Sequence, residues 1–370
     1  MSQPSDKVLR ELVEIYSPTG RENKAVEKFG KQMLELGADD FTIDAVGNGI
    51  AIFQGGKPNV LLCGHIDTVP GKLPVREENG IIYGRGATDA KASLVALMFG
   101  ARLALDRGFS GKITVVAAIG EEGPGKGIME ISAKLPKSDY AIFGEPSGVT
   151  GVTVGYRGRV LMELEFSTEQ HHASAPWLGD NAIDLAIRSW QAVKNTYGQN
   201  REFSSVSAAI TSISGGDADN MTPSKARILL DLRYPPSKKH EDVLSDVVAV
   251  SSAGIPYPPK VKIRSYVNPY VSGMRTDLAM AFKLSISKIT GSQASLLFKS
   301  GSGDMNILGS AWGIPCITYG PGNPQLSHTT REEIRMADVW TSAEVVADVL
   351  MHLQQEIDSN RSHVKERSIH

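Results

Sequence analysis

The sequence predicts an α/β protein whose mostly parallel sheet is interrupted by an inserted α+β domain. Three observations support this fold class. First, 370 residues with 41% hydrophobic and 22% charged side chains are ordinary for a globular protein and long enough for two or three domains. Second, strand-like and helical segments alternate up to residue 153, as they do in parallel α/β sheets. Third, residues 154–264 follow the order β-α-β-β-α-β of a ferredoxin-like domain.

The first block, residues 1–153, starts with two helices. Residues 7–37 predict an amphipathic helix, a turn at SPTG and a second helix from Glu22. The runs GIAIF, NVLLCG and IIYG predict strands, and KASLVALMFGARLALDR predicts a helix. KITVVAAIG is nearly all apolar and β-branched, which indicates a strand covered on both faces. A helix at 126–134 and the strand DYAIFGE complete this block.

The inserted domain, 154–264, has a different pattern. It starts with GRVLMELEFST, which alternates as a half-exposed strand does. A helix at 181–195, two strands, a helix at 240–253 and the strand KVKIRSYV follow. We expect the first strand to offer a free edge to a second copy of the chain. From 265 to 370 the α/β pattern returns and completes the domain that 1–153 begins, with a last helix from residue 338.

Charge and cysteine usage exclude several classes of protein. The 39 basic and 41 acidic residues give a net charge of −2, so neither nucleic acid nor a membrane surface is expected as a partner. The two cysteines, Cys63 and Cys316, lie in apolar strand-like runs and are expected to be reduced core thiols of a cytoplasmic protein. The first residues lack the apolar core of a signal peptide, and no apolar stretch approaches the ~20 residues of a membrane span.

Polar motifs follow several of the predicted strands. In GHIDTVP, His65 and Asp67 have the same parity along a strand and therefore point the same way. A lone histidine there is often structural, but a carboxylate beside it can fix the tautomer of a metal ligand. Asp89 closes GRGATD before a helix, where it is either an N-terminal cap or an oxygen ligand. The tract GEEGPGKG resembles a phosphate-binding loop, but Gly127 stands where Ser or Thr is needed.

These motifs predict a metal site at one edge of the sheet. Glu121 and Glu122 follow one strand, Glu145 follows the next, and His328 comes after a later strand and a glycine-rich loop. In a parallel sheet such positions meet at the carboxyl ends of the strands. Taken alone, the Glu-Glu pair is usually a solvated turn. Histidines and carboxylates without cysteine suit two hydrolytic ions, with zinc expected and cobalt or manganese as alternatives.

The motifs together resemble the M20 family of metallopeptidases and amidohydrolases. The resemblance runs through GHIDTVP, GRGATDAK, GEEG, FGEPS, KSGSGDMN and LSHTT, which span nearly the whole chain. It implies a zinc-hydrolase catalytic domain with an inserted dimerisation or lid domain. It also implies roles at the site: Asp67 orients a ligand, Glu121 is the general base, and the metal ligands are His65 and Glu145 for one ion, Glu122 and His328 for the other, and Asp89 between them.

Within the family, the sequence is most similar to hydrolases that release lysine or ornithine from a small acidic amino-group carrier protein of the LysW type. The resemblance implies that Asn220 and Arg233 hold the substrate, and that the protein is a homodimer in which His172, or its neighbour His171, acts across the interface. Gly301 and Gly303 are expected either to offer backbone N–H groups to a carboxylate or to form a plain turn.

Three other functions were weighed against this one. The same fold and site would serve an N-acetylornithine deacetylase or a succinyl-diaminopimelate desuccinylase. A non-catalytic binding protein is disfavoured because every expected ligand and the base are present. A nucleotide-dependent enzyme rests only on the incomplete phosphate-binding loop. An acidic carrier would be steered by basic residues at the cleft, for which the sequence offers Lys72, Arg76, Arg157, Arg159 and Lys299, although scattered surface cations are common.

Overall fold

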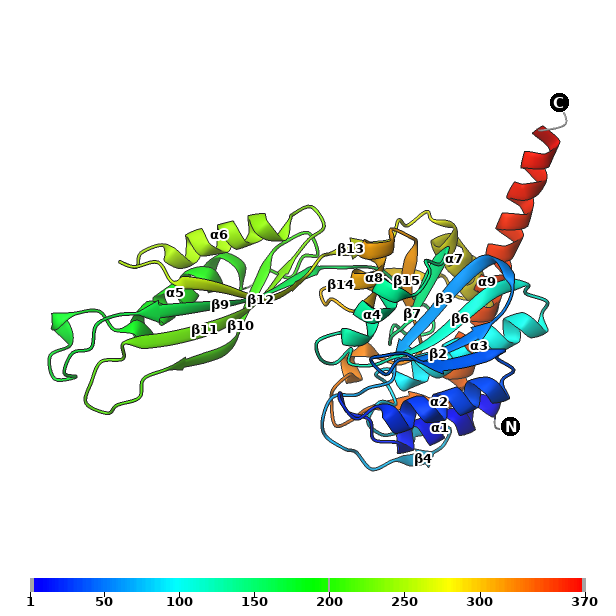
Figure 1. The fold of residues 1–370 in the computed structure, drawn as a ribbon, viewed down its shortest axis with the longest axis horizontal. Helices are drawn as coiled ribbons and strands as arrows, with labels where there is room; N and C mark the ends of the chain where they lie inside the picture. The colour runs from blue at the N-terminus through cyan, green and yellow to red at the C-terminus, as the bar shows by residue number, and fades with distance from the viewer. Residues whose placement is uncertain (1–2, 199, 368–370) are drawn as a thin grey trace. The chain divides into compact units, whose positions relative to one another are not determined.

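The chain divides into two compact units, of which the second is inserted into the first (Figure 1). The computed structural model describes residues 3–198 and 200–367. Unit 1 comprises Met1–Gly155, Ser272–Leu297 and Gly303–His370, and unit 2 comprises Tyr156–Val271 and Phe298–Ser302. A short piece of chain far from the main insertion, residues 298–302, therefore also belongs to unit 2.

The large sheet of unit 1 is parallel in its centre and antiparallel towards both sides. Its strands run in the order β1-β2-β6-β3-β7-β15-β8. The neighbours β6, β3, β7 and β15 are mutually parallel, whereas β2 pairs with β6 and β8 pairs with β15 in the antiparallel sense. The bounds of these strands are β1 (Asp40–Ile43), β2 (Gly49–Phe53), β3 (Gly56–His65), β6 (Gly111–Ala118), β7 (Tyr140–Gly144), β8 (Gly151–Tyr156) and β15 (Cys316–Tyr319).

Helices pack against this sheet and bury its central strands. Every residue of β7 and β15 is buried, as the apolar runs in the sequence predict for strands covered on both faces. The α-helices of this unit are α1 (Pro4–Glu14), α2 (Asn23–Glu35), α3 (Lys91–Asp106), α4 (Lys126–Lys134), α7 (Asp277–Thr290), α8 (Asp304–Trp312) and α9 (Met336–Arg367). The sequence predicted all of them except α8, which follows the glycine-rich segment SGSG.

A second, small sheet in unit 1 joins two distant loops. It has the order β16-β5-β4, with β4 (Arg76–Glu78), β5 (Ile81–Tyr83) and β16 (Glu333–Arg335) all antiparallel. Two further short strands, β13 (Tyr270–Val271) and β14 (Ser295–Lys299), lie near the boundaries between the units along the chain.

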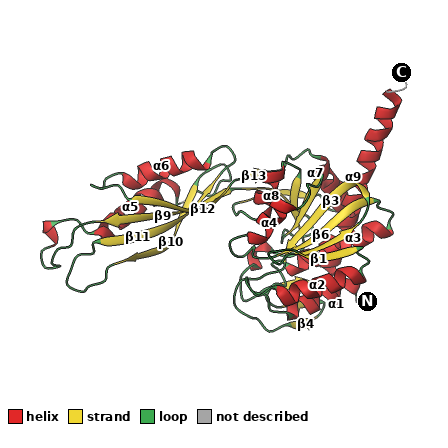
Figure 2. Ribbon diagram, in the orientation of Figure 1, coloured by secondary structure: helices red, strands yellow, loops and turns green. Residues whose placement is uncertain are grey.

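Unit 2 is the predicted β-α-β-β-α-β domain (Figure 2). Its four antiparallel strands have the order β10-β11-β9-β12, and residues of both helices join the strands in one apolar core. The bounds are β9 (Gly158–Ser167), η1 (Pro176–Leu178), α5 (Ala182–Tyr197), β10 (Ser207–Gly215), β11 (Lys225–Tyr234), α6 (His240–Ser252) and β12 (Lys260–Val267).

The expectation of a free edge on the first strand of this domain is wrong. β9 lies between β11 and β12, so both of its edges are paired, and the edge strands are β10 and β12. The alternating sequence of β9 has another cause: alternate side chains face the core, while Glu165 and its neighbours form ion pairs with adjacent strands, such as Arg227 Nε at 3.0 Å.

Candidate active site

The predicted polar residues meet at the carboxyl ends of neighbouring parallel strands in unit 1. His65 is the last residue of β3. Glu121 and Glu122 lie in the turn after β6, and Glu145 directly follows β7. Because β3 lies between β6 and β7 and is parallel to both, these chain segments leave the sheet at the same edge.

His65 lies at the centre of this cluster and is almost fully buried. Its Nε2 atom is 3.1 Å from Oδ1 of Asp89 and 3.4 Å from Oε1 of Glu145. The imidazole therefore directs one nitrogen at two carboxylates. Its other nitrogen, Nδ1, is used in a different contact that fixes the ring.

His328 provides the second imidazole of the cluster. Its Nε2 atom is 2.8 Å from Oε1 of Glu122 and 3.4 Å from Oδ2 of Asp89. His328 has a φ of 65°, in the left-handed region that non-glycine residues rarely adopt. Asp89 thus stands between the two histidines, with a different carboxylate oxygen facing each of them.

Asp67 contacts the site differently from the sequence-based expectation. Nδ1 of His65 lies 3.0 Å from the backbone carbonyl oxygen of Asp67, whereas the nearest carboxylate oxygen is 3.7 Å away. The carboxylate instead accepts hydrogen bonds from the backbone N–H groups of Glu121 and Glu122, at 3.1 and 3.2 Å, and from the hydroxyl of Thr19 at 2.6 Å. Asp67 therefore orients His65 through its main chain and the two glutamates through its side chain.

Burial and neighbouring charges both shift the pKa values of these groups. Burial raises the pKa of Glu121 well above its usual value, and the charge of Glu145 adds to the effect. Burial also raises the pKa of Glu122. For His65, burial opposes protonation, but the charge of Glu145 and the nearby carboxylates of Asp67 and Asp89 raise its pKa well above 6.5. The hydrogen bond to Asp89 is the largest of the effects that raise the pKa of His328 to about 9.

Asp304 belongs to the same cluster but was not predicted. It is the first residue of α8, and burial raises its pKa to about 7. The preceding residue, Gly303, lies against the base candidate, since a Cβ atom there would be 3.3 Å from Oε1 of Glu121. The sequence segment SGSGDMN contains both residues. The signal for Asp304 in the sequence is an acid directly after the glycine pair Gly301 and Gly303.

The donor set fits divalent metal ions. Among the described residues, ligand atoms lie within 4.8 Å of one another in two groups, His65 with Glu121 and Glu145, and His65 with Asp89 and Glu122. Several carboxylates gathered around two imidazoles, with no thiolate among them, form a hard to intermediate donor set of the kind that zinc, cobalt and manganese accept. Burial is the main cause of the raised pKa of Glu121, and cations between these carboxylates would relieve the added repulsion from Glu145.

The segment that resembles a phosphate-binding loop has a packing role. Gly127, in the first turn of α4, lies so close to β6 that a Cβ atom would be 2.3 Å from the carbonyl oxygen of Ile119. The side chain of Asn48 joins the two segments, because it accepts from Ile119 N–H and donates to the Gly127 carbonyl, both at 3.0 Å. The glycine that breaks the nucleotide motif is therefore required by this close approach.

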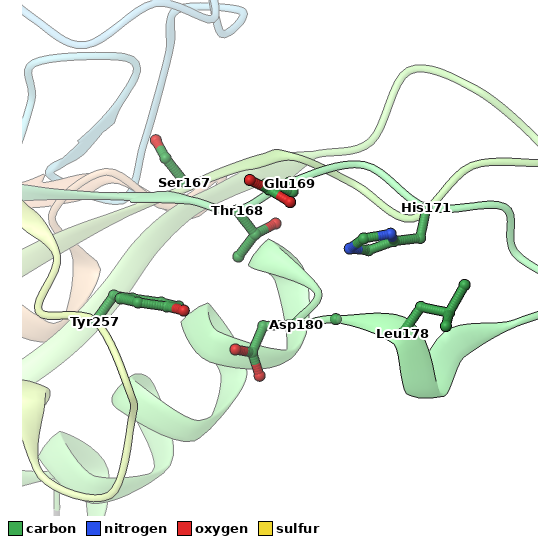
Figure 3. A pocket seen from close by; sticks show the side chains of 8 residues that line it. Ser167, Thr168, Glu169, His171, Leu178, Asp180 and Tyr257 are labelled. Carbon is green, nitrogen blue, oxygen red and sulfur yellow. The ribbon is translucent and has the colours of Figure 1, made fainter.

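In unit 2, His171 and His172 have different environments. His171 lines a cavity of about 470 Å³ together with Glu169, Asp180 and Tyr257, and its ring lies against Gly179 (Figure 3). The His172 side chain is exposed, and its Nδ1 lies 2.7 Å from the hydroxyl of Ser174.

An antiparallel β-bridge brings the segment that contains Asn220 next to the segment of the two histidines. The N–H of Ala173 donates to the Asn220 carbonyl at 2.8 Å, and His172 forms a bridge with Met221. The predicted residues His172 and Asn220 are thus neighbours within unit 2.

Arg233 lies near the end of β11 in a cluster of charged side chains. Its Nε donates to Asp231 at 2.6 Å, and Asp231 also accepts from Nε of Arg159 at 2.8 Å. Nη1 of Arg233 is 3.3 Å from the hydroxyl of Ser302, next to Gly301 in the same unit. The guanidinium groups of Arg159 and Arg233 thus share the single carboxylate of Asp231. The three side chains together carry a net positive charge, which can attract an anionic group.

Fold and site together define a metal-dependent hydrolase of the α/β type with an inserted domain. The chain belongs to Peptidase family M20/M25/M40, which matches residues 61–352. Among the described residues, no helix combines the length and the apolar character that crossing a membrane requires.

Curated relatives match almost the whole chain. A protein of Thermococcus kodakarensis, provisionally named a LysW-lysine/LysW-ornithine hydrolase, is 35% identical over 354 residues, which cover 95% of this chain and 93% of the relative. The LysW-lysine/LysW-ornithine hydrolase of Saccharolobus solfataricus is 30% identical over 362 residues, covering 96% and 98%. The protein of that name from Sulfurisphaera tokodaii is 30% identical over 334 residues, covering 90% and 91%.

Solved structures of peptidases share the fold. A tripeptidase from Staphylococcus aureus superposes with a TM-score of 0.80 at 21% identity, covering 95% of this chain and 98% of that one. The aminopeptidase PepT from Bacillus cereus superposes with a TM-score of 0.78 at 20% identity and the same coverage. The predicted fold class is therefore confirmed, and its sheet is mixed, with the parallel part in the centre.

Proposed function

We propose that this protein hydrolyses the amide bond that joins lysine or ornithine to a small acidic amino-group carrier protein of the LysW type, in lysine or arginine biosynthesis. The observation that carries the proposal is the match to LysW-lysine/LysW-ornithine hydrolases over more than 90% of both chains. The site supports it, because two imidazoles and several carboxylates suit metal-assisted hydrolysis of an amide.

In this proposal the ligands divide into two sets that share Asp89. His65 and Glu145 hold one ion, Glu122 and His328 hold the other, and Asp89 bridges them. The distances support this division, since each carboxylate oxygen of Asp89 faces a different histidine. Two divalent ions, with zinc expected and cobalt or manganese as alternatives, would polarise the substrate carbonyl and make water more acidic.

Glu121 is proposed to take the proton from the attacking water and to return it to the leaving amine. Its environment suits this role, because a base with a raised pKa can both accept and donate a proton near neutral pH. The hydrogen bond from its N–H to Asp67 fixes its backbone. Gly303 lies against one carboxylate oxygen and leaves space for that side chain.

Residues of unit 2 are proposed to bind the substrate. An imidazole N–H of His172 would donate a hydrogen bond to the reacting carbonyl oxygen as negative charge develops there. His172 suits this role better than His171 because its ring is exposed, whereas His171 faces a cavity in its own unit. Asn220 would bind the carbonyl group, and Arg233, with the backbone N–H of Gly301, would bind a carboxylate. The N–H of Gly303, which was also expected to bind the carboxylate, is instead donated to Oδ1 of Asn306 at 3.0 Å in the first turn of α8.

We further propose that the protein is a homodimer through unit 2, with His172 acting on the site of the second copy. Because β9 is paired on both sides, the strands available for pairing are β10 and β12. Exposed apolar side chains on these strands, including Ile213 at 55% and Tyr266 at 51%, give such an edge a surface to bury.

The decisive experiment compares substrates at equal metal loading. Zinc-loaded protein is incubated separately with lysyl-carrier, ornithyl-carrier, N-acetylornithine and succinyl-diaminopimelate, and the released amine is measured as kcat/KM. We expect the highest value for one of the carrier substrates and a value about 10²–10⁴-fold lower for the Glu121→Gln variant. A higher value for N-acetylornithine or succinyl-diaminopimelate would replace the proposal with that small-substrate activity. Metal binding without release from any substrate would leave a non-catalytic binding protein.

A further inference from the structure

We propose that Arg85 is a positioning residue for the metal site. Its guanidinium, paired with Glu332, joins three of the segments that carry candidate ligands, those of His65, Asp89 and His328. The inference rests on the proposed function only in assuming that the site binds metal ions.

The first observation is the set of acceptors around Arg85. Its Nε donates to the carbonyl oxygen of Gly71, and its Nη1 to that of Thr329, both at 3.0 Å. Gly71 lies in the loop between His65 and β4, and Thr329 directly follows His328 in sequence. Arg85 itself lies in the segment that leads to Asp89. Its side chain therefore joins that segment to the backbones of the loop after His65 and the loop after His328.

Glu332 reinforces the same junction from the opposite side. Its carboxylate pairs with Nη1 of Arg85 and accepts the N–H of Gly86 at 2.8 Å, while its carbonyl accepts the N–H of Gly84 at 3.2 Å. Two more bonds, between the hydroxyl of Thr88 and the backbone of Glu333, continue the contact at 2.7 and 3.1 Å. The two segments are thus joined as far as the residue before Asp89.

Burial makes this junction rigid and costly to disturb. The side chain of Arg85 is 7% exposed and that of Glu332 is 1% exposed, so water does not compete for their bonds. The planar guanidinium presents several donors in a fixed arrangement, which a lysine ammonium cannot reproduce. The guanidinium bonds to three oxygen atoms in directions that its planar shape sets. It therefore fixes both the spacing and the orientation of the segments that carry these oxygens.

His328 depends on this junction because its own packing does not hold it. Its side chain is 52% exposed, and its backbone is in the left-handed conformation. The local bonds around it are those of Thr329, whose N–H and hydroxyl both bond to the Leu326 carbonyl at 3.1 and 2.8 Å. Arg85 holds the carbonyl of the same Thr329. Movement of this threonine would carry His328 away from Asp89 and Glu122.

The test separates positioning from stability with a double variant. Arg85→Met alone would leave Glu332 as a buried, unpaired charge and would destabilise the fold. The variant Arg85→Met/Glu332→Gln removes both charges and keeps two side chains of similar size. Zinc affinity is measured by competition with a chelator, and Tm is measured on the metal-free protein. Lys288→Met, which breaks the ion pair with Asp348 on α7 and α9, is the structural control.

We expect the double variant to fold and to bind the more weakly held zinc ion about 10–100-fold less tightly than the wild type, as for other groups that orient ligands. Arg85→Lys should recover only part of the affinity, whereas Lys288→Met should lower Tm without changing zinc binding. Unchanged zinc affinity in the double variant would overturn the inference. So would a loss of zinc affinity that Lys288→Met also shows for an equal decrease in Tm. Zinc binding needs no substrate, so a wild type that binds zinc and hydrolyses nothing overturns only the proposed function. A wild type that binds no zinc overturns both.

Discussion

The backbone N–H of Glu121 donates a hydrogen bond to the carboxylate of Asp67 at 3.1 Å, although the two residues come from turns that follow different strands. This contact changes the expected role of Asp67. Its carboxylate accepts from Glu122 and Thr19 as well, and its carbonyl oxygen contacts His65. A single residue thus supports the base candidate and two metal-ligand candidates.

Asp67→Asn is expected to impair both halves of the site. The asparagine amide group would place N–H donors where the carboxylate now accepts the N–H groups of Glu121 and Glu122. We expect a loss of about 10–100-fold in kcat/KM and weaker binding of both ions. Metal affinity and steady-state kinetics measure the effect. A loss confined to the ion held by His65 would show that the carboxylate acts through that histidine alone.

Glu121→Gln and Glu122→Gln should separate the roles of two adjacent glutamates. The first change should reduce kcat by about 10²–10⁴-fold, the usual contribution of a general base, and leave two ions per chain. The second should weaken the ion near His328, because Glu122 Oε1 is 2.8 Å from that imidazole. Metal analysis and kcat of both variants check this. Full activity of the first variant, or loss of its metals, would require the two roles to be exchanged.

Asp89→Ala should remove both ions together. The carboxylate oxygens of Asp89 face different histidines, at 3.1 Å for His65 and 3.4 Å for His328, so each half of the site loses a ligand. Metal content after dialysis is the measurement, with Asp106→Ala on the exposed end of α3 as a matched control. A variant that retains two tightly bound ions would show that Asp89 does not bridge them.

Mixing two inactive variants should restore activity if His172 acts across a dimer. In a mixture of His172→Ala and Glu121→Gln, about half of the dimers are mixed and one site in each mixed dimer is intact, so about a quarter of all sites recover. Subunit exchange is verified by mass spectrometry before the assay. Verified exchange without recovery would place the action of His172 within its own chain or identify His171 as the donor.

A carrier substrate should show a stronger dependence on salt than a small one. Raising salt from ~0.05 to ~0.5 M is expected to lower kcat/KM severalfold for the acidic carrier through screening, with little change for N-acetylornithine. Two residues of the proposed basic rim differ in their surroundings: Arg76 pairs with Glu78 at 2.9 Å, whereas Lys72 is exposed. Lys72→Glu should therefore reduce the salt response, and Lys31→Glu on α2 is the control. Equal salt responses for both substrates would contradict steering by charge.

Much of the site was predictable because it follows from strand order. His65, Glu121 and Glu145 each follow an apolar run, and parallel strands bring such positions to one edge without further information. What the sequence did not reveal depends on the contacts of single atoms. The pattern placed Asp67 beside His65, but only the structure shows that the carbonyl oxygen, and not the carboxylate, makes the contact.

Contacts between segments that are far apart in the chain could not be predicted from the sequence either. Arg85 and Glu332 are 247 positions apart, and neither stands out in a charged, glycine-rich loop until the fold brings them together. The position of β9 in the middle of its sheet is similar: alternation reports which face is buried and carries no information about edges.

The insertion of unit 2 has a consequence for the order in which a newly made chain can become active. β7 emerges from the ribosome before unit 2, but its parallel neighbour β15 emerges only after it. Domains fold as units during synthesis, at roughly 5–20 residues per second. Glu122 and Asp89 are therefore present many seconds before His328, and a nascent chain holds an incomplete set of ligands until the whole of unit 2 has been translated. With the proposed ligand set, both ions could therefore be bound tightly only after His328 has been synthesised.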